Sequence, residues 1–158
     1  MKNILRTLFL FFLCAQIHFA NAQPKLAPCH WSYKIEQTGS DTALLFITAK
    51  LDSGWHLYSQ HIADGGPIPT KFTFTSSPDF KLIGETEEGK PHKEYDPNFD
   101  MDLLYFEKES VFRQKIKVLA KKDFEIKGTI DYMVCMEQCI FPPAEEFIFK
   151  VRGNSGGN

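Results

Sequence analysis

Several features that would assign this chain to a common functional class are missing from its sequence. Lysine and arginine total 18 against 20 aspartates and glutamates, so there is no basic excess of the kind that nucleic-acid binding requires. No run approaches the roughly 20 apolar residues of a mature transmembrane helix. We also find no serine-histidine-aspartate arrangement with interpretable spacing, no glycine-rich phosphate loop and no specific metal signature. We therefore expect neither a cofactor nor a metal ion nor a nucleic-acid partner.

The amino terminus has the pattern of an export signal. Lys2 and Arg6 precede the apolar run 8–13, and Ala20-Asn21-Ala22 offers a small-x-small cleavage site. A lipoprotein signal at Cys14 is disfavoured, because Leu13 stands where a small residue is normally needed. We predict a cleaved signal peptide over 1–22, a single domain over 23–158 and a periplasmic location. That compartment is oxidising, so closely spaced cysteines are expected to form a disulfide.

The mature chain alternates apolar and polar residues in short segments separated by turn signals, and it lacks a convincing helical pattern. The expected strands are 31–38, 42–51, 55–59, 71–75, 80–83, 110–118, 124–135 and 145–151. The segment 42–51 is the most apolar and is predicted to be central, whereas 153–158 is predicted to be a frayed tail. About eight such strands predict an all-β fold, an immunoglobulin-like antiparallel β-sandwich.

One segment, 85–102, breaks this alternation. It is rich in charge, contains Gly89, Pro91 and Pro97, and is predicted to be a long loop or a set of short edge strands. It also carries Tyr95 and Phe99. Long loops in compact domains are often functional, so this segment is a candidate part of a site.

Cys135 and Cys139 form the most informative motif. Residues i and i+4 of an extended strand lie roughly 13 Å apart, too far for a disulfide, so the backbone must turn between them. Pro142-Pro143 then ends any regular strand or helix. If the preceding strand stays regular, its alternation places Cys135 on the polar face, where a partner could reach it. The pair is either redox-active or a structural disulfide.

Other residues near the pair bear on its chemistry. No histidine or lysine is close to it in sequence, whereas Asp131 and Glu137 are, and nearby carboxylates disfavour a thiolate. The pair is thus expected to be a mild nucleophile. Met133, Cys135, Met136 and Cys139 also form a soft-ligand cluster that could hold Cu(I), although methionines more often serve packing.

The remaining candidate residues have simpler interpretations. Cys29 is the odd cysteine after signal cleavage and is interpreted as a spare thiol near the flexible start, or as the site of an intermolecular disulfide. His56 and His61 are expected at the surface or at a sheet edge. Trp55, Tyr58 and Phe72 are interpreted as core or rim packing.

Four motifs together resemble a known family. They are Gly54-Trp55-His56-Leu57-Tyr58-Ser59, the loop Gly65-Gly66-Pro67-Ile68-Pro69, the segment from Tyr95 to Phe106, and Cys135 to Cys139 followed by Phe141-Pro142-Pro143-Ala144-Glu145. In these the chain resembles the amino-terminal periplasmic domain of the thiol:disulfide interchange protein DsbD, the disulfide bond corrector family. The resemblance spans nearly the whole mature chain.

The resemblance implies an immunoglobulin-like sandwich that acts as a component of a protein-disulfide reductase. Its pair, Cys135 and Cys139, would take electrons from a membrane-embedded thiol reductase. It would pass them to a periplasmic disulfide isomerase or a thioredoxin-like protein of cytochrome c maturation. A capping aromatic would shield the pair until a partner docks, with Phe99 the first candidate by position and Tyr95 the second. Cys139, near the turn tip, is our candidate for the attacked sulfur.

The chain departs from the family pattern in two respects. Only three residues separate its cysteines, and the transmembrane and thioredoxin-like domains are absent from the sequence, so the electron donor is expected to be a separate protein. Two other functions stay open. One is a non-redox binding or scaffold sandwich with a structural disulfide, and the other is a Cu(I) carrier.

Overall fold

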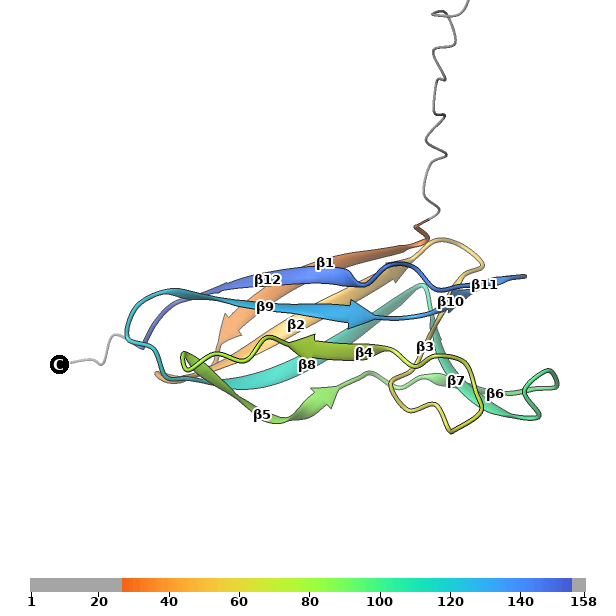
Figure 1. The fold of residues 1–158 in the computed structure, drawn as a ribbon, viewed down its shortest axis with the longest axis horizontal. Helices are drawn as coiled ribbons and strands as arrows, with labels where there is room; N and C mark the ends of the chain where they lie inside the picture. The colour runs from red at the N-terminus through yellow and green to blue at the C-terminus, as the bar shows by residue number, and fades with distance from the viewer. Residues whose placement is uncertain (1–26, 155–158) are drawn as a thin grey trace, which may run out of the picture.

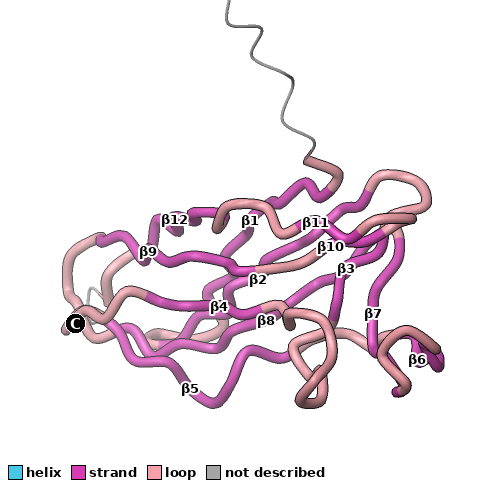
Figure 2. Tube along the Cα trace, turned by 45° about the vertical axis from the view of Figure 1, so that its right-hand side comes forward, coloured by secondary structure: helices cyan, strands magenta, loops and turns pink. Residues whose placement is uncertain are grey.

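A computed structural model describes residues 27–154 of the chain, and the predicted signal peptide lies outside them. The described part contains twelve β-strands and no helix (Figure 2). The strands are β1 Cys29–Gln37, β2 Thr42–Leu51, β3 His56–Tyr58, β4 Lys71–Phe74, β5 Phe80–Glu87, β6 His92–Asp96, β7 Met101–Glu107, β8 Glu109–Val118, β9 Phe124–Asp131, β10 Val134–Cys135, β11 Cys139–Ile140 and β12 Glu145–Val151. This confirms the predicted all-β class. Residues 27–154 hold no helix of the length and hydrophobicity that a bilayer crossing requires.

The strands form three antiparallel sheets. One has the order β1-β2-β8-β5 and a second has the order β12-β9-β4, and these two face each other as the layers of a sandwich (Figure 1). The third, with the order β11-β10-β3-β7-β6, extends from one end of the sandwich, at the right of Figure 1. The arrangement confirms an immunoglobulin-like antiparallel β-sandwich, with β2 inside its sheet as predicted.

Alternation along the strands builds the core between the two layers. Phe112 and Ile116 of β8 face inward with no exposed surface, while Arg113, Lys115 and Lys117 alternate with them on the outer face. Aromatic contacts join the layers: the ring centroids of Phe72 and Phe112 lie 4.8 Å apart. The main core fills the space between the layers and takes in Leu57, Phe106 and Val134 from one face of the end sheet, so the opposite face of that sheet lies outside it.

Among the connections between the sandwich and the end sheet, two are very short. The first runs from β7 into β8 through Lys108, whose φ of 62° turns the backbone. The second runs from β9 into β10 through Tyr132 and Met133, which belong to no strand. The end sheet is therefore anchored to both layers by covalent continuity as well as by packing.

The segment 85–102 contains short edge strands, as one of its two interpretations predicted: β5 extends to Glu87, and β6 pairs with β7 at the edge of the end sheet. Two other expectations need correction. Twelve strands replace about eight, because the irregular stretches also contribute short strands. Finally, Gly153 and Asn154 are not frayed: their amides donate to Asp123 and to the Ala120 carbonyl at 3.0 and 2.8 Å. Residues 155–158 lie outside the described part.

Candidate functional site

Cys135 and Cys139 are joined by a disulfide at the tip of the β10–β11 hairpin. The two residues are direct partners in the hairpin register, with their Cα atoms 4.0 Å apart. The backbone turn that the spacing requires is therefore present, made by residues 136–138. Three intervening residues suffice because the cysteines end two paired strands instead of lying along one.

The two sulfurs differ in their surroundings. Cys139 is exposed, whereas Cys135 is only 8% exposed. Cys135 belongs to a small apolar cluster with Tyr58 and Leu103 that is separate from the main core. The expectation that Cys135 lies on an accessible polar face was wrong, because the chain leaves the regular β9 strand at Tyr132 and Met133 before β10 begins. The reachable sulfur is that of Cys139.

The register of the end sheet identifies which side chains share the face of the disulfide. Cys135 lies opposite His56, and His56 lies opposite Glu107. Tyr58, two residues after His56, lies opposite Tyr105. Directly opposed residues and residues two apart point to the same side of a sheet. The face therefore presents the disulfide, then His56 and Tyr58, then the side chains of β7 and β6.

Tyr58 contacts the disulfide directly. Its hydroxyl lies 3.6 Å from Cys139 Sγ and is the donor, because a disulfide sulfur carries no hydrogen. Burial, aided by Asp96, raises the pKa of Tyr58, so the hydroxyl keeps its proton at neutral pH. Thr70 fixes this strand by donating its hydroxyl to the Tyr58 carbonyl at 2.6 Å. Tyr58 is thus a positioned hydrogen-bond donor to the exposed sulfur, in addition to the packing role expected from the sequence.

His56 lies beside the pair although no histidine is close to it in sequence, and it lies inside the end sheet and not at the surface or at a sheet edge as expected. It is half-buried on β3, opposite Cys135, and its ring contacts the rings of Tyr58 and Tyr105 at centroid distances of 5.1 and 4.9 Å. Burial lowers the pKa of His56 despite the opposing influence of Glu107 and other carboxylates. His56 and Tyr58 both lie in the Gly54–Ser59 motif, which was the signal available in the sequence.

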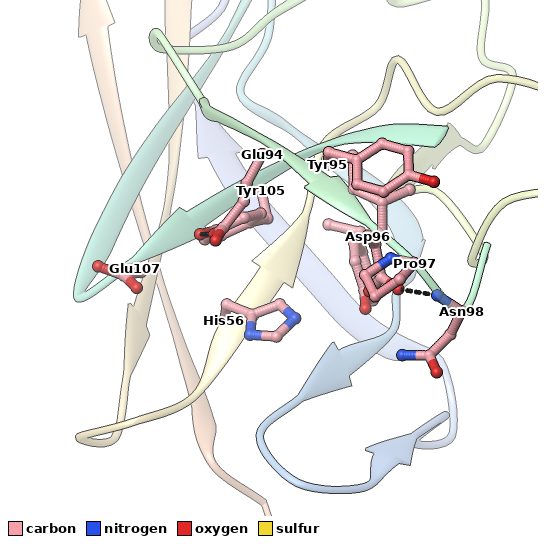
Figure 3. Close-up of a pocket in the computed structure, with 10 residues that line it drawn as sticks. His56, Glu94, Tyr95, Asp96, Pro97, Asn98, Tyr105 and Glu107 are labelled. Atoms are coloured by element: carbon pink, nitrogen blue, oxygen red, sulfur yellow. Dashed lines mark hydrogen bonds between the residues drawn. The ribbon is translucent and has the colours of Figure 1, made fainter. Parts of the chain in front are cut away.

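A pocket of about 330 Å³ opens on this face of the end sheet. His56 and Tyr58 form part of its wall. Three carboxylates, of Glu94, Asp96 and Glu107, and the phenol of Tyr105 also line it (Figure 3). Tyr105 donates its hydroxyl to Glu94 at 2.5 Å, and this bond raises the pKa of Tyr105 to about 12. The surroundings of the pair are therefore acidic, and this acidity comes mainly from β6 and β7.

The two candidate caps occupy different places on the β6–β7 hairpin. Phe99, in the turn, is half-buried and packs against the cluster that contains Cys135. Tyr95 is 57% exposed and donates a hydrogen bond to Asp100 at 2.6 Å. Figure 3 shows its ring on the opposite side of β6 from Asp96. Phe99 is thus the candidate that lies near the pair.

Cys29 is not the accessible spare thiol that the sequence suggested. It begins β1, is 5% exposed and belongs to the main core. Burial, with Glu145 and Asp52 nearby, raises the pKa of its thiol to about 12. A buried, protonated thiol cannot form an intermolecular disulfide while the domain stays folded.

The soft-ligand cluster is spread over the hairpin. Met133 packs against the Cys135 cluster, and Met136 at the tip is 49% exposed, with its sulfur against Gly54. Within residues 27–154 no group of three or more histidine, cysteine or acidic side chains is arranged to hold a metal ion.

Comparison with known proteins gives a family and a fold. The family model described as the N-terminal part of the thiol:disulfide interchange protein DsbD matches residues 24–151. No curated protein sequence matches the chain.

Two solved structures share the fold. The N-terminal periplasmic domain of ScsB from Proteus mirabilis is 16% identical with a TM-score of 0.58, over 84% of this chain and 49% of that one, so the chain spans about half the length of that structure. The reduced DsbD N-terminal domain of Neisseria meningitidis is 15% identical with a TM-score of 0.51, over 85% of this chain and 95% of that one. Because the family model matches residues 24–151 and the DsbD N-terminal domain of Neisseria meningitidis has the same fold, this chain belongs to the family of the N-terminal domain of the thiol:disulfide interchange protein DsbD.

Proposed function

We propose that this protein is a periplasmic thiol:disulfide interchange module that relays electrons through Cys135 and Cys139. A membrane-embedded thiol reductase supplies the electrons. A thioredoxin-like protein or a disulfide isomerase, including those of cytochrome c maturation, receives them. The observation that carries the proposal is the position of the disulfide, at a hairpin tip and outside the main core, with only Cys139 exposed. Family membership supports the same chemistry.

The short loop closed by the disulfide argues against a purely structural role. Chain-entropy arguments give a loop of five residues about 2 kcal/mol of stabilisation, against about 4.7 kcal/mol for a loop of 100 residues. The bond joins neighbouring strands of one hairpin and does not bridge the two layers of the sandwich. The fold is thus expected to survive its reduction.

Exposure assigns the two cysteines different roles. The donor's thiolate attacks Cys139 Sγ, the Cys135–Cys139 bond breaks, and Cys135 leaves with the electron pair. The donor's second thiol then resolves the mixed disulfide and leaves both cysteines reduced. In the forward transfer, Cys139 attacks the acceptor disulfide and Cys135 resolves the resulting mixed disulfide. Phe99, packed against the Cys135 cluster, shields the pair between encounters.

The test is the redox equilibrium of the pair in the mature protein. The pair is alkylated across a graded thiol buffer and analysed by mass spectrometry, while circular dichroism follows the fold. We expect a reduction potential above about −300 mV, which is the range of labile disulfides, and an intact fold after reduction. A pair that resists reduction until the domain unfolds would identify a structural disulfide and refute the relay.

A trapping experiment tests the assignment of roles. Cys135→Ser leaves the exposed thiol without its resolving partner and is expected to accumulate a mixed disulfide with an oxidised thioredoxin-like acceptor. Cys139→Ser is the matched variant, and it should trap almost nothing because Cys135 is buried. Equal trapping by both variants would contradict the assignment of Cys139 as the attacked sulfur.

A further inference from the structure

The proposed relay requires a thiolate from the buried cysteine of the pair. Cys135 must resolve the mixed disulfide as a thiolate, yet its cluster with Tyr58 and Leu103 is apolar and it is 8% exposed. Forming a charge in apolar surroundings is costly unless a neighbouring group accepts the proton. The residues around Cys135 therefore decide how fast the pair can release its acceptor.

His56 is the basic side chain placed for this task. It lies opposite Cys135 in the register of β3 and β10. Directly opposed residues of an antiparallel pair have Cβ atoms about 4.5–5.5 Å apart, so the sulfur is within reach of an imidazole nitrogen after a change of χ1 rotamer. In the disulfide form its ring rests against Tyr58 and Tyr105.

Resting on the proposed relay, we infer that His56 is the general base that takes the proton of Cys135 when the reduced pair hands its electrons on. The register places an imidazole, able to accept a proton at neutral pH, beside the one sulfur of the pair that solvent reaches poorly.

The Cys135 thiol gives its proton to the imidazole of His56, and the thiolate attacks Cys139 Sγ in the mixed disulfide with the acceptor. The Cys135–Cys139 bond forms and the bond from Cys139 to the acceptor breaks. The acceptor sulfur leaves with the electron pair. The pair loses two electrons, the acceptor disulfide gains them, and the proton on His56 passes to solvent or to the leaving thiolate.

The charged neighbours of His56 suit both halves of this cycle. Burial keeps the imidazole neutral at rest, ready to accept a proton. Glu107 on β7, with Glu94 and Asp96 on β6, favours the imidazolium once it forms. The other titratable groups on this face are Tyr58, Tyr105, His92 and the pair itself, and burial or hydrogen bonding keeps both phenols protonated at neutral pH.

Stopped-flow oxidation of the reduced mature protein by 4,4′-dithiodipyridine separates the two attacks. The first equivalent of thiopyridone reports attack by Cys139, and the second reports resolution by Cys135. We expect His56→Gln to slow the second phase at least about tenfold at neutral pH. The expected factor is smaller than the loss of 100-fold or greater that removal of a general base typically causes, since solvent can also accept the proton of Cys135. The first phase should be nearly unchanged.

The matched control is His92→Gln. His92 also contacts Tyr105, at 5.8 Å between ring centroids, but it lies on β6 with β7 and β3 between it and Cys135. Both phases are expected to stay at the wild-type rate. A wild-type second phase in folded His56→Gln would overturn the role of His56. A folded wild-type protein that releases no thiopyridone would instead refute the relay itself.

A wild-type pH profile keeps the inference testable if His56→Gln does not fold. With His56 as base, the second-phase rate should rise with pH and level off below the ordinary histidine pKa of 6.5, because burial lowers the pKa of His56. A rate that climbs steadily to the usual thiol range, about pH 8.5, would show that the thiol ionises without His56 and would overturn the proposal.

Discussion

At the scale of single residues, the chemistry of the pair depends on side chains that are distant in sequence. Tyr58 donates a hydrogen bond to Cys139, and His56 lies across the strand from Cys135. The exposed sulfur thus has a neutral donor, and the buried sulfur has a titratable neighbour. The two sulfurs of the pair thus differ both in their exposure to solvent and in the side chain that lies beside each of them.

Replacing Tyr58 tests the donor at Cys139. In the reduced protein the hydroxyl stabilises a thiolate on Cys139, and hydrogen bonds to charged groups contribute about 1.5–3 kcal/mol. Tyr58→Phe keeps the ring and is expected to lower the thiolate fraction of Cys139 at neutral pH roughly tenfold, since 1.36 kcal/mol is one pKa unit. Iodoacetamide alkylation rates across pH measure this. Tyr105→Phe, whose hydroxyl serves Glu94, should leave the rates unchanged; an equal effect of both variants would contradict the role of Tyr58.

Cys29 gives a pH dependence of stability. Its thiol pKa is raised from 9.0 to about 12, so the folded state holds the proton more tightly than the unfolded state. This contribution is complete below pH 9 and is lost as the pH rises towards 12, at up to roughly 4 kcal/mol. Urea unfolding at successive pH values should show the decline, and Cys29→Ala should show a shallower one. Identical slopes for the two proteins would mean that other groups cause the loss.

At the scale of elements, two hairpins meet at the site. The β10–β11 hairpin carries the disulfide, and the β6–β7 hairpin places Phe99 of its turn against the Cys135 cluster. Strand β3 lies between β10 and β7 and supplies His56 and Tyr58. In the proposed relay, a partner that attacks Cys139 meets the tip of the β10–β11 hairpin, while Phe99 of the β6–β7 turn packs against the cluster of the buried Cys135.

The two cap candidates can be separated by mutation. Phe99→Ala removes a half-buried ring from the cluster around Cys135 and is expected to speed reduction of the disulfide by a small thiol such as dithiothreitol several-fold. Tyr95→Ala removes an exposed ring on the other side of β6 and should leave the rate unchanged. A larger acceleration with Tyr95→Ala, or none with Phe99→Ala, would reassign or remove the cap.

At the scale of the whole molecule, the disulfide face of the end sheet packs separately from the main core. The main core lies between β1-β2-β8-β5 and β12-β9-β4 and takes in Leu57, Phe106 and Val134 of the end sheet, while the disulfide face has a small cluster of its own. We therefore expect redox change and partner docking at this face to leave most of the buried apolar surface undisturbed.

Hydrogen exchange should show this division. Amides of β2, β8 and β9, whose inward side chains fill the core, are expected to open only with global unfolding. Amides of β6, β10 and β11 should exchange faster and accelerate further on reduction of the disulfide. Mass spectrometry of the oxidised and reduced protein measures both. Acceleration spread evenly over all strands would show that the disulfide supports the entire fold.

The sequence by itself determined the all-β class, most strand positions and the cysteine pair, because alternation and turn residues act through neighbouring positions along the chain. Only the tertiary structure decided that Cys135 is buried, that Cys29 belongs to the core and that the segment 85–102 forms a hairpin. It also decided that His56 and Tyr58 lie beside the disulfide, since strand register brings together residues about 80 positions apart and local periodicity carries no record of which strands pair.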